Sequence, residues 1–206
     1  MFVRITWLGH ASVMLAHGAL RVYIDPWKLS PALPKADLIL ITHEHYDHFS
    51  APDIERLKGE QTRVIAPFAH PLVTDRMGVG ETLAAGDILI TTVPAYNIAK
   101  EYHPRGNKWV GYIVTMGGKR IYHPGDTDRI PEMLGIAPDV ALLPVGGTYT
   151  MDAAEACRAV SDIGPRTVIP IHYGDIVGSG RDAADLRAGC TVPVEVLDPG
   201  GSLTVE

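Results

Sequence analysis

The sequence predicts an α/β protein built as a four-layer αββα sandwich, in which two facing sheets are covered by helices on their outer sides. Short strand-like segments recur along the whole chain, and only a few helical segments interrupt them. Hydrophobic residues make up 46% of the 206 residues, which suffices for one large core. We therefore expect a single domain over residues 1–206.

The N-terminal quarter of the chain is expected to be mostly strands. Residues 2–8, 12–16 and 20–24 have the pattern of an antiparallel meander, and Asp25-Pro26 ends its third strand. Residues 37–42 form an apolar run between polar residues, which is typical of a strand buried on both faces. Ser50 and Pro52 then predict the start of a helix, because serine caps a first turn and proline is tolerated in it.

The remaining elements alternate in the same way. Strands are expected at residues 62–66 and 88–93, with a short helix between them at residues 68–77 in spite of Pro71. Residues 109–116 and 119–123 form a hairpin pattern around two glycines. Strands at 140–145 and 167–171, helices at 152–163 and 182–188, and two terminal strands complete the prediction.

Composition and charge exclude several function classes. Lys and Arg total 18 against 24 for Asp and Glu, and no basic run offers a surface for phosphates, so we do not expect nucleic-acid binding. No secretory signal or apolar stretch of about 20 residues stands out, so we expect a soluble, cytoplasmic protein that does not bind membranes. Cys157 and Cys190 lack a Cys-x-x-Cys spacing and are expected to be small packing residues.

A dense cluster of ligand-type side chains follows the apolar run 37–42. His43, His45, Asp47 and His48 fall within six residues. In extended backbone His43 and His45 point to the same side, where imidazole nitrogens at about 2.0–2.1 Å suit zinc. A single histidine in a loop is usually only hydrogen-bonded or solvated, but this density predicts a metal site, with two neighbouring pairs for two metals.

The cluster and three other segments resemble a known family. Thr-His-x-His-x-Asp-His at residues 42–48 resembles the signature motif of the metallo-β-lactamase superfamily. Residues 125–127 (Gly-Asp-Thr) resemble its bridging-aspartate motif, and residues 169–172 (Ile-Pro-Ile-His) its final histidine motif. Residues 8–12 and 24–26 resemble the opening of the branch that contains ascorbate-6-phosphate lactonase and the N-acyl-phosphatidylethanolamine phospholipase D enzymes.

This resemblance implies a metal-dependent hydrolase with two divalent ions. One ion would be bound by His43 and His45, the other by Asp47, His48 and His172, with Asp126 bridging them. The nucleophile would be a metal-bound hydroxide, so no serine or cysteine nucleophile is needed. Asp47 and Asp126 are the residues that we expect to be catalytic. Zinc is the expected metal, and manganese and iron remain alternatives because imidazole binds all three.

One position departs from the family pattern. Asn97 stands where the superfamily usually supplies another histidine to the first metal. His103, the amide oxygen of Asn97 or a water can fill that place, and we favour His103. We expect Asp25 to orient a ligand histidine or to serve only as a turn residue, and His10 to cap the substrate pocket or to hydrogen-bond within its turn.

The substrate is less well defined than the reaction. Arg105, in the polar loop 96–109, and Tyr149, after a Gly-Gly pair, are the expected substrate contacts. They favour a small anionic lactone, ester or amide. A phosphodiesterase and a non-enzymatic metal-binding module are the alternatives, and assembly into a homo-oligomer is left open.

Overall fold

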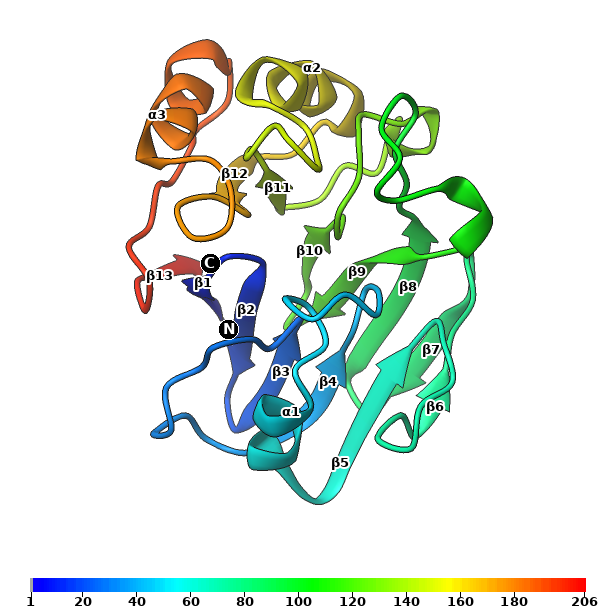
Figure 1. The fold of residues 1–206 in the computed structure, drawn as a ribbon. Helices are drawn as coiled ribbons and strands as arrows, with labels where there is room; N and C mark the ends of the chain where they lie inside the picture. The colour runs from blue at the N-terminus through cyan, green and yellow to red at the C-terminus, as the bar shows by residue number, and fades with distance from the viewer. Residues whose placement is uncertain (1) are drawn as a thin grey trace.

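The computed structural model describes residues 2–206 and folds them into two facing mixed sheets (Figure 1). The seven-stranded sheet has the order β13 (Ser202–Val205), β1 (Val3–Gly9), β2 (Ser12–His17), β3 (Leu20–Ile24), β4 (Ala36–Leu40), β5 (Lys58–Ala66) and β6 (Asp75–Arg76). The six-stranded sheet has the order β12 (Thr167–Ile171), β11 (Val140–Pro144), β10 (Lys119–His123), β9 (Val110–Met116), β8 (Ile88–Pro94) and β7 (Thr82–Ala85).

Helices cover the outer sides of both sheets, as an αββα sandwich requires. In α1 (Ala51–Leu57), Ile54 and Leu57 pack in one apolar cluster with Tyr23 of β3 and Val64 of β5. The helices α2 (Ala153–Ile163) and α3 (Gly180–Gly189) pack together beside β11 and β12 (Figure 1). Two 3₁₀ turns, η1 (Arg105–Asn107) and η2 (Pro131–Met133), lie in the connections. The predicted fold class is confirmed.

β4 shows why the run that precedes the histidine cluster is apolar. Successive side chains of a strand point to opposite faces. Leu38 and Leu40 therefore face the core between the sheets, whereas Ile39 and Ile41 join the cluster under α1. Because both faces of β4 are buried, the strand is fixed in place and delivers residues 42–48 at a defined edge of the sheet.

The helix expected at residues 68–77 is wrong. This segment contains turns and the two-residue strand β6 instead. Thr74 donates its backbone N–H to the carbonyl of Val64 at 2.8 Å, and the Asp75 carboxylate accepts from Arg63 at 2.7 and 3.0 Å. Pro71 has no N–H for a helix ladder, and the segment takes its partners from β5 instead.

The two cysteines meet although they are far apart in the sequence. Cys157 of α2 and Cys190 at the end of α3 are half-buried, with their Sγ atoms 2.7 Å apart. They contribute to the packing between the two helices, as expected. None of the helices within residues 2–206 combines the length and the apolar character needed to span a membrane.

Candidate metal centre

The candidate ligands gather at one edge of the molecule, where loops leave strands of both sheets. The segment 42–48 follows β4, Asp126 follows β10 and His172 follows β12, while Asn97 and His103 lie in the loop after β8. His10 lies in the turn between β1 and β2, and Asp25 directly follows β3. The same end of several strands thus carries every ligand-type residue that the sequence suggested.

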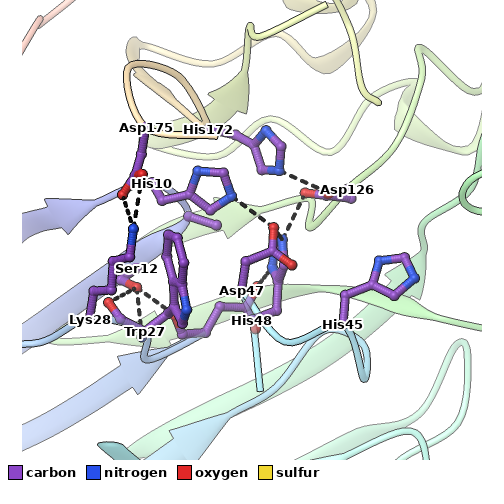
Figure 2. A network of polar contacts seen from close by, with 12 residues as sticks. His10, Ser12, Trp27, Lys28, His45, Asp47, His48, Asp126, His172 and Asp175 are labelled. Atoms are coloured by element: carbon purple, nitrogen blue, oxygen red, sulfur yellow. Dashed lines mark hydrogen bonds and ion pairs between the residues drawn. The ribbon is translucent and has the colours of Figure 1, made fainter. Parts of the chain in front are cut away.

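Asp126 lies at the centre of this group (Figure 2). Its Oδ1 is 3.3 Å from Nε2 of His48, and its Oδ2 is 3.3 Å from Nε2 of His103 and 3.0 Å from Nε2 of His172. Burial by itself raises the pKa of this carboxyl, but His172 and His48 bring the Asp126 pKa well below its usual range. An ionised, buried carboxylate therefore faces imidazoles from three separate loops.

Several buried atoms around Asp126 have no hydrogen-bond partner among residues 2–206. They are Nε2 of His48, His103 and His172, together with Oδ1 of Asp126. Buried polar atoms are nearly always paired, and a bound ion would pair this convergent set. Imidazole nitrogens and carboxylate oxygens are the donors that divalent transition metals take, so the residues fit a metal site.

The ligand-type atoms fall into three overlapping groups. Within each group, the ligand atoms lie within 4.8 Å of one another. One group contains His43, His45 and His103. A second contains Asp47, His48 and His172, with His10 beside them, and a third joins His43 and His48 to Asp126. All seven sequence-predicted ligands are therefore brought together in these groups.

Asp25 fixes the orientation of His48. Its buried carboxylate accepts hydrogen bonds from the backbone N–H of Thr42 at 2.8 Å and from Oγ1 of Thr42 at 2.7 Å. It also accepts from Nδ1 of His48 at 2.7 Å, which leaves Nε2 of that ring facing Asp126. Burial lowers the pKa of His48, but the Asp126 and Asp25 carboxylates outweigh it and raise the pKa well above its ordinary value.

Asn97 lies behind His103 rather than beside it. Its Oδ1 accepts hydrogen bonds from the backbone N–H of His103 at 2.9 Å and from Nδ1 of the same residue at 3.0 Å. Its Nδ2 donates to Asp128 and to the carbonyl of Tyr149, each at 3.0 Å. The amide oxygen is thus engaged by His103, whose own Nε2 points to Asp126.

His10 contacts a candidate ligand and the loop of another. Its Nε2 lies 3.0 Å from Oδ2 of Asp47 (Figure 2), and its backbone carbonyl accepts from the backbone N–H of His172 at 2.8 Å. Burial raises the pKa of Asp47, but the hydrogen bond with His10 helps to bring the Asp47 pKa below its usual range. His10 therefore supports two of the predicted ligands.

The backbone around the site is strained where these contacts meet. His10, Asp25 and His172 have φ angles of 48°, 48° and 57°, which are uncommon for residues other than glycine. Such conformations persist where surrounding contacts hold them and are concentrated at functional sites. The hydrogen bonds of Asp25 and of the His10 carbonyl supply such contacts here.

A cavity of about 240 Å³ opens onto the ligands. It is lined by His45, Tyr46, Asp47, Tyr102, His103, Asp126, Tyr149 and Ile176. Tyr149, which the sequence suggested, is present. Tyr46 lies inside the 42–48 motif and Tyr102 in the polar loop 96–109, but neither was chosen as a substrate contact. Ile176 was not expected, because no sequence motif marks it.

Arg105 does not reach this cavity. It pairs with Glu132 at 2.9 Å, and its guanidinium lies 4.9 Å from the centre of the Tyr96 ring. It lines a different cavity, together with Lys108. The sequence suggested it as a substrate contact because it shares a loop with His103, but its guanidinium pairs with Glu132 at a different cavity.

Comparison with known proteins identifies the family of the chain. A family model for the beta-lactamase superfamily domain matches residues 4–172. A UPF0173 metal-dependent hydrolase of Archaeoglobus fulgidus is 36% identical over 97% of this chain and 98% of its own length, and one of Thermococcus kodakarensis is 35% identical over 98% and 99%.

Two solved structures have the same fold over nearly the whole chain. A candidate metal-dependent hydrolase from Parabacteroides distasonis is 34% identical, with a TM-score of 0.82 over 94% of this chain and 92% of its own. Igni18, a metallo hydrolase from Ignicoccus hospitalis, is 26% identical, with a TM-score of 0.79 over 100% of this chain and 99% of its own. Matches of this extent show that the chain belongs to the beta-lactamase superfamily and is a metal-dependent hydrolase of that superfamily.

Proposed function

We propose that this hydrolase cleaves a small carbonyl compound, a lactone, an ester or an amide, at a centre for two divalent ions. The observation that carries the proposal is the set of partnerless buried nitrogens around Asp126, which borders an open cavity. His43, His45 and His103 would hold one ion, Asp47, His48 and His172 the other, and Asp126 would be shared. Two ions bound there supply a Lewis acid for the carbonyl oxygen and lower the pKa of a water toward neutrality.

We propose zinc as the metal, with manganese and iron as the alternatives. The donor set contains five imidazoles and two carboxylates, with no thiolate in it. Zinc takes imidazole and carboxylate readily and has no redox chemistry to control. Manganese and iron accept the same donors, so the metal content of the purified protein decides among them.

The chain's own residues hold the reacting groups in place. Asp126 and Asp47 line the cavity, so both touch the space in which a carbonyl would lie. The Asp47 pKa lies below its usual range, so its carboxylate is ionised at neutral pH, and His10 holds Oδ2 in position. Asp25 and Asn97 orient His48 and His103 through their Nδ1 atoms.

Among the carbonyl compounds we propose lactones as the preferred substrates, because residues 8–12 and 24–26 resemble the branch that contains a lactonase. The anionic substrate expected from the sequence loses its main support, since Arg105 pairs with Glu132 outside the cavity. A phosphodiester remains the alternative, because the ions themselves can neutralise its single charge. A purely metal-binding module is disfavoured by a cavity that exposes the ligands to a small molecule.

The test is a substrate panel on protein purified without added metal. Elemental analysis gives the metal content, and the same sample is assayed with lactones, carboxylic esters, amides and phosphodiesters. We expect turnover of at least one carbonyl class, lost on chelation and restored by zinc. An Asp126→Asn variant should show no turnover. Preferential cleavage of phosphodiesters would support the alternative, and bound metal without any turnover would support the binding module.

A further inference from the structure

We infer that the substrate carries an uncharged aromatic or apolar group, bound by Tyr46, Tyr102, Tyr149 and Ile176 beside the metal centre. We call these four side chains the aromatic wall. The inference rests on the proposed function, because it specifies the class of compound that the same site accepts.

The aromatic wall is assembled from four loops around the ligands. Tyr46 lies within the histidine segment, Tyr102 precedes His103, Tyr149 lies between β11 and α2, and Ile176 lies between β12 and α3. The rings of Tyr102 and Tyr149 meet edge to face, with centres 4.6 Å apart, and the Tyr46 ring meets that of Trp27 at 6.0 Å. Each of the three tyrosines thus has an aromatic neighbour.

The wall leaves much apolar surface in contact with solvent. Tyr46 is 67% exposed, Tyr102 49% and Ile176 37%. Exposed apolar side chains gathered around a concave site mark a ligand surface, since burial of that surface favours binding. An aromatic ring in the ligand gains additional energy from edge-to-face contact with tyrosine.

Charge argues against a ligand with an anionic tail. Among the described residues that line the cavity, none is lysine or arginine. Lys100 pairs with Asp128 and lies 3.8 Å from Glu155, Lys28 pairs with Asp175 at 3.0 Å, and Arg105 pairs with Glu132.

The size of the cavity limits the ligand further. Its volume of about 240 Å³ lies below the usual range of roughly 300–1,000 Å³ for ligand pockets. A single ring together with the group that reaches the metals fits this space. The class is therefore a small carbonyl compound with one neutral ring or a short apolar chain.

The inference is tested by binding, so that it does not depend on turnover. Three hydroxamates share one metal-binding group and differ in the tail: acetohydroxamate, phenylacetohydroxamate and 4-carboxyphenylacetohydroxamate. Their dissociation constants are measured by calorimetry on the zinc-loaded full chain. We expect the phenyl compound to bind about 10-fold more tightly than the other two. Equal or tighter binding of the carboxylated compound would overturn the inference.

Variants of the aromatic wall test whether its side chains cause the tighter binding of the phenyl compound. Tyr102→Ala and Ile176→Ala should each reduce the advantage of the phenyl tail severalfold, and Tyr102→Phe should retain it. Leu134→Ala is the matched control, because Leu134 is 76% exposed and lines another cavity. Metal content is measured for each variant, since Tyr102 adjoins His103. An unchanged advantage in Tyr102→Ala and Ile176→Ala with full metal content would contradict the inference.

The two proposals fail in different ways. Absence of turnover on every carbonyl class would remove the proposed function, while tighter binding of the phenyl hydroxamate would still support the aromatic wall as a ligand surface. Turnover of carboxylated lactones in preference to neutral aryl lactones would retain the proposed function and overturn the assignment of the wall.

Discussion

At the candidate metal centre, hydrogen bonds donated by Nδ1 leave Nε2 of two histidines facing Asp126. Asp25 accepts from His48, and Asn97 accepts from His103, so that Nε2 of each ring points to Asp126. Groups that orient metal ligands in this way are often worth about 10- to 100-fold in metal affinity.

Asn97 provides the clearest test of this orienting role. We expect Asn97→Ala to weaken binding of one ion by about 10- to 100-fold, because His103 loses the acceptor for its Nδ1. Zinc titration with a competing chelator measures the loss. Asn107→Ala, at an exposed asparagine of η1, is the control and should bind as the native chain does. Equal affinities in the two variants would contradict the role of Asn97.

The metal-free protein should be most stable near pH 6.5. Burial and the neighbouring His48 lower the pKa of His43, so the unfolded chain binds more protons below about pH 6.5 and stability falls as the pH decreases. The raised pKa of His48 stabilises the fold below about pH 6.5, and this contribution is lost as the pH rises through the folded-state pKa. Asp126 changes the stability of the metal-free protein only at more acidic pH, because its pKa is lowered.

Thermal unfolding of chelator-treated protein between pH 5 and 8 measures this dependence. Stability should fall less steeply below pH 6.5 in His43→Asn, where His10, His45 and His123 still have lowered pKa values, and less steeply above pH 6.5 in His48→Asn. The exposed His70→Asn should retain both dependences. A melting temperature that rises or falls steadily over the whole range would show that these two histidines do not control the stability of the metal-free protein.

Sequence patterns predicted the ligands better than their surroundings. His43, His45, Asp47 and His48 are close in the chain, so their spacing alone places them together. Asn97 was read as a departure from a ligand pattern, and its hydrogen bonds to His103 depend on how the loop after β8 folds. The pairing of Arg105 with Glu132 could not be predicted, because the two residues lie far apart in the sequence and no residue pattern predicts η1.

At the scale of elements, buried strands and tightly packed loops place the site. β4 was predicted because apolar residues on both of its faces leave a clear pattern. The segment 68–77 was predicted wrongly, because its structure depends on hydrogen bonds to β5 and not on its own periodicity. Local patterns thus identify elements that bury a face, and fail where the partners are distant in sequence.

The loops after β11 and β12 meet at Gly146. A Cβ at this position would lie 2.5 Å from the carbonyl oxygen of His172 and 2.8 Å from Val177. We expect Gly146→Ala to lower the free energy of unfolding by about 1–3 kcal/mol and to weaken metal binding through displacement of His172.

Denaturant unfolding and zinc titration measure the two effects. Gly180→Ala is the matched control, because a Cβ there meets no atom within 4 Å and the residue lies at the start of α3. If Gly146→Ala is as stable as this control and binds zinc equally well, close packing of the two loops does not position His172.

At the scale of the whole molecule, the metal centre joins the two sheets. The segment 42–48 extends from the seven-stranded sheet, whereas Asp126, His103 and His172 extend from strands of the six-stranded sheet. Ions held by both sets would connect the two halves of the sandwich. The single domain over residues 1–206 stays a prediction. Assembly into a homo-oligomer stays an open question.

Removal of the metal should therefore lower the stability of the entire fold. A ligand present at about 1,000 times its dissociation constant stabilises by roughly 4 kcal/mol, which for a chain of this size corresponds to a rise of about 8–16 °C in the melting temperature. Calorimetry before and after chelation measures the shift, and added zinc should restore it. An unchanged melting temperature after complete removal of metal would contradict a link between the sheets.

The measurement that tests the two-ion centre most directly is the metal content of three proteins. Native chain, His103→Ala and His172→Ala are purified in parallel without added metal and analysed for zinc, manganese and iron per chain. We expect two ions in the native chain and one in each variant, because the two histidines belong to separate groups and each has its Nε2 within 3.3 Å of Oδ2 of Asp126. Native metal content in both variants would contradict the assignment of the ligands.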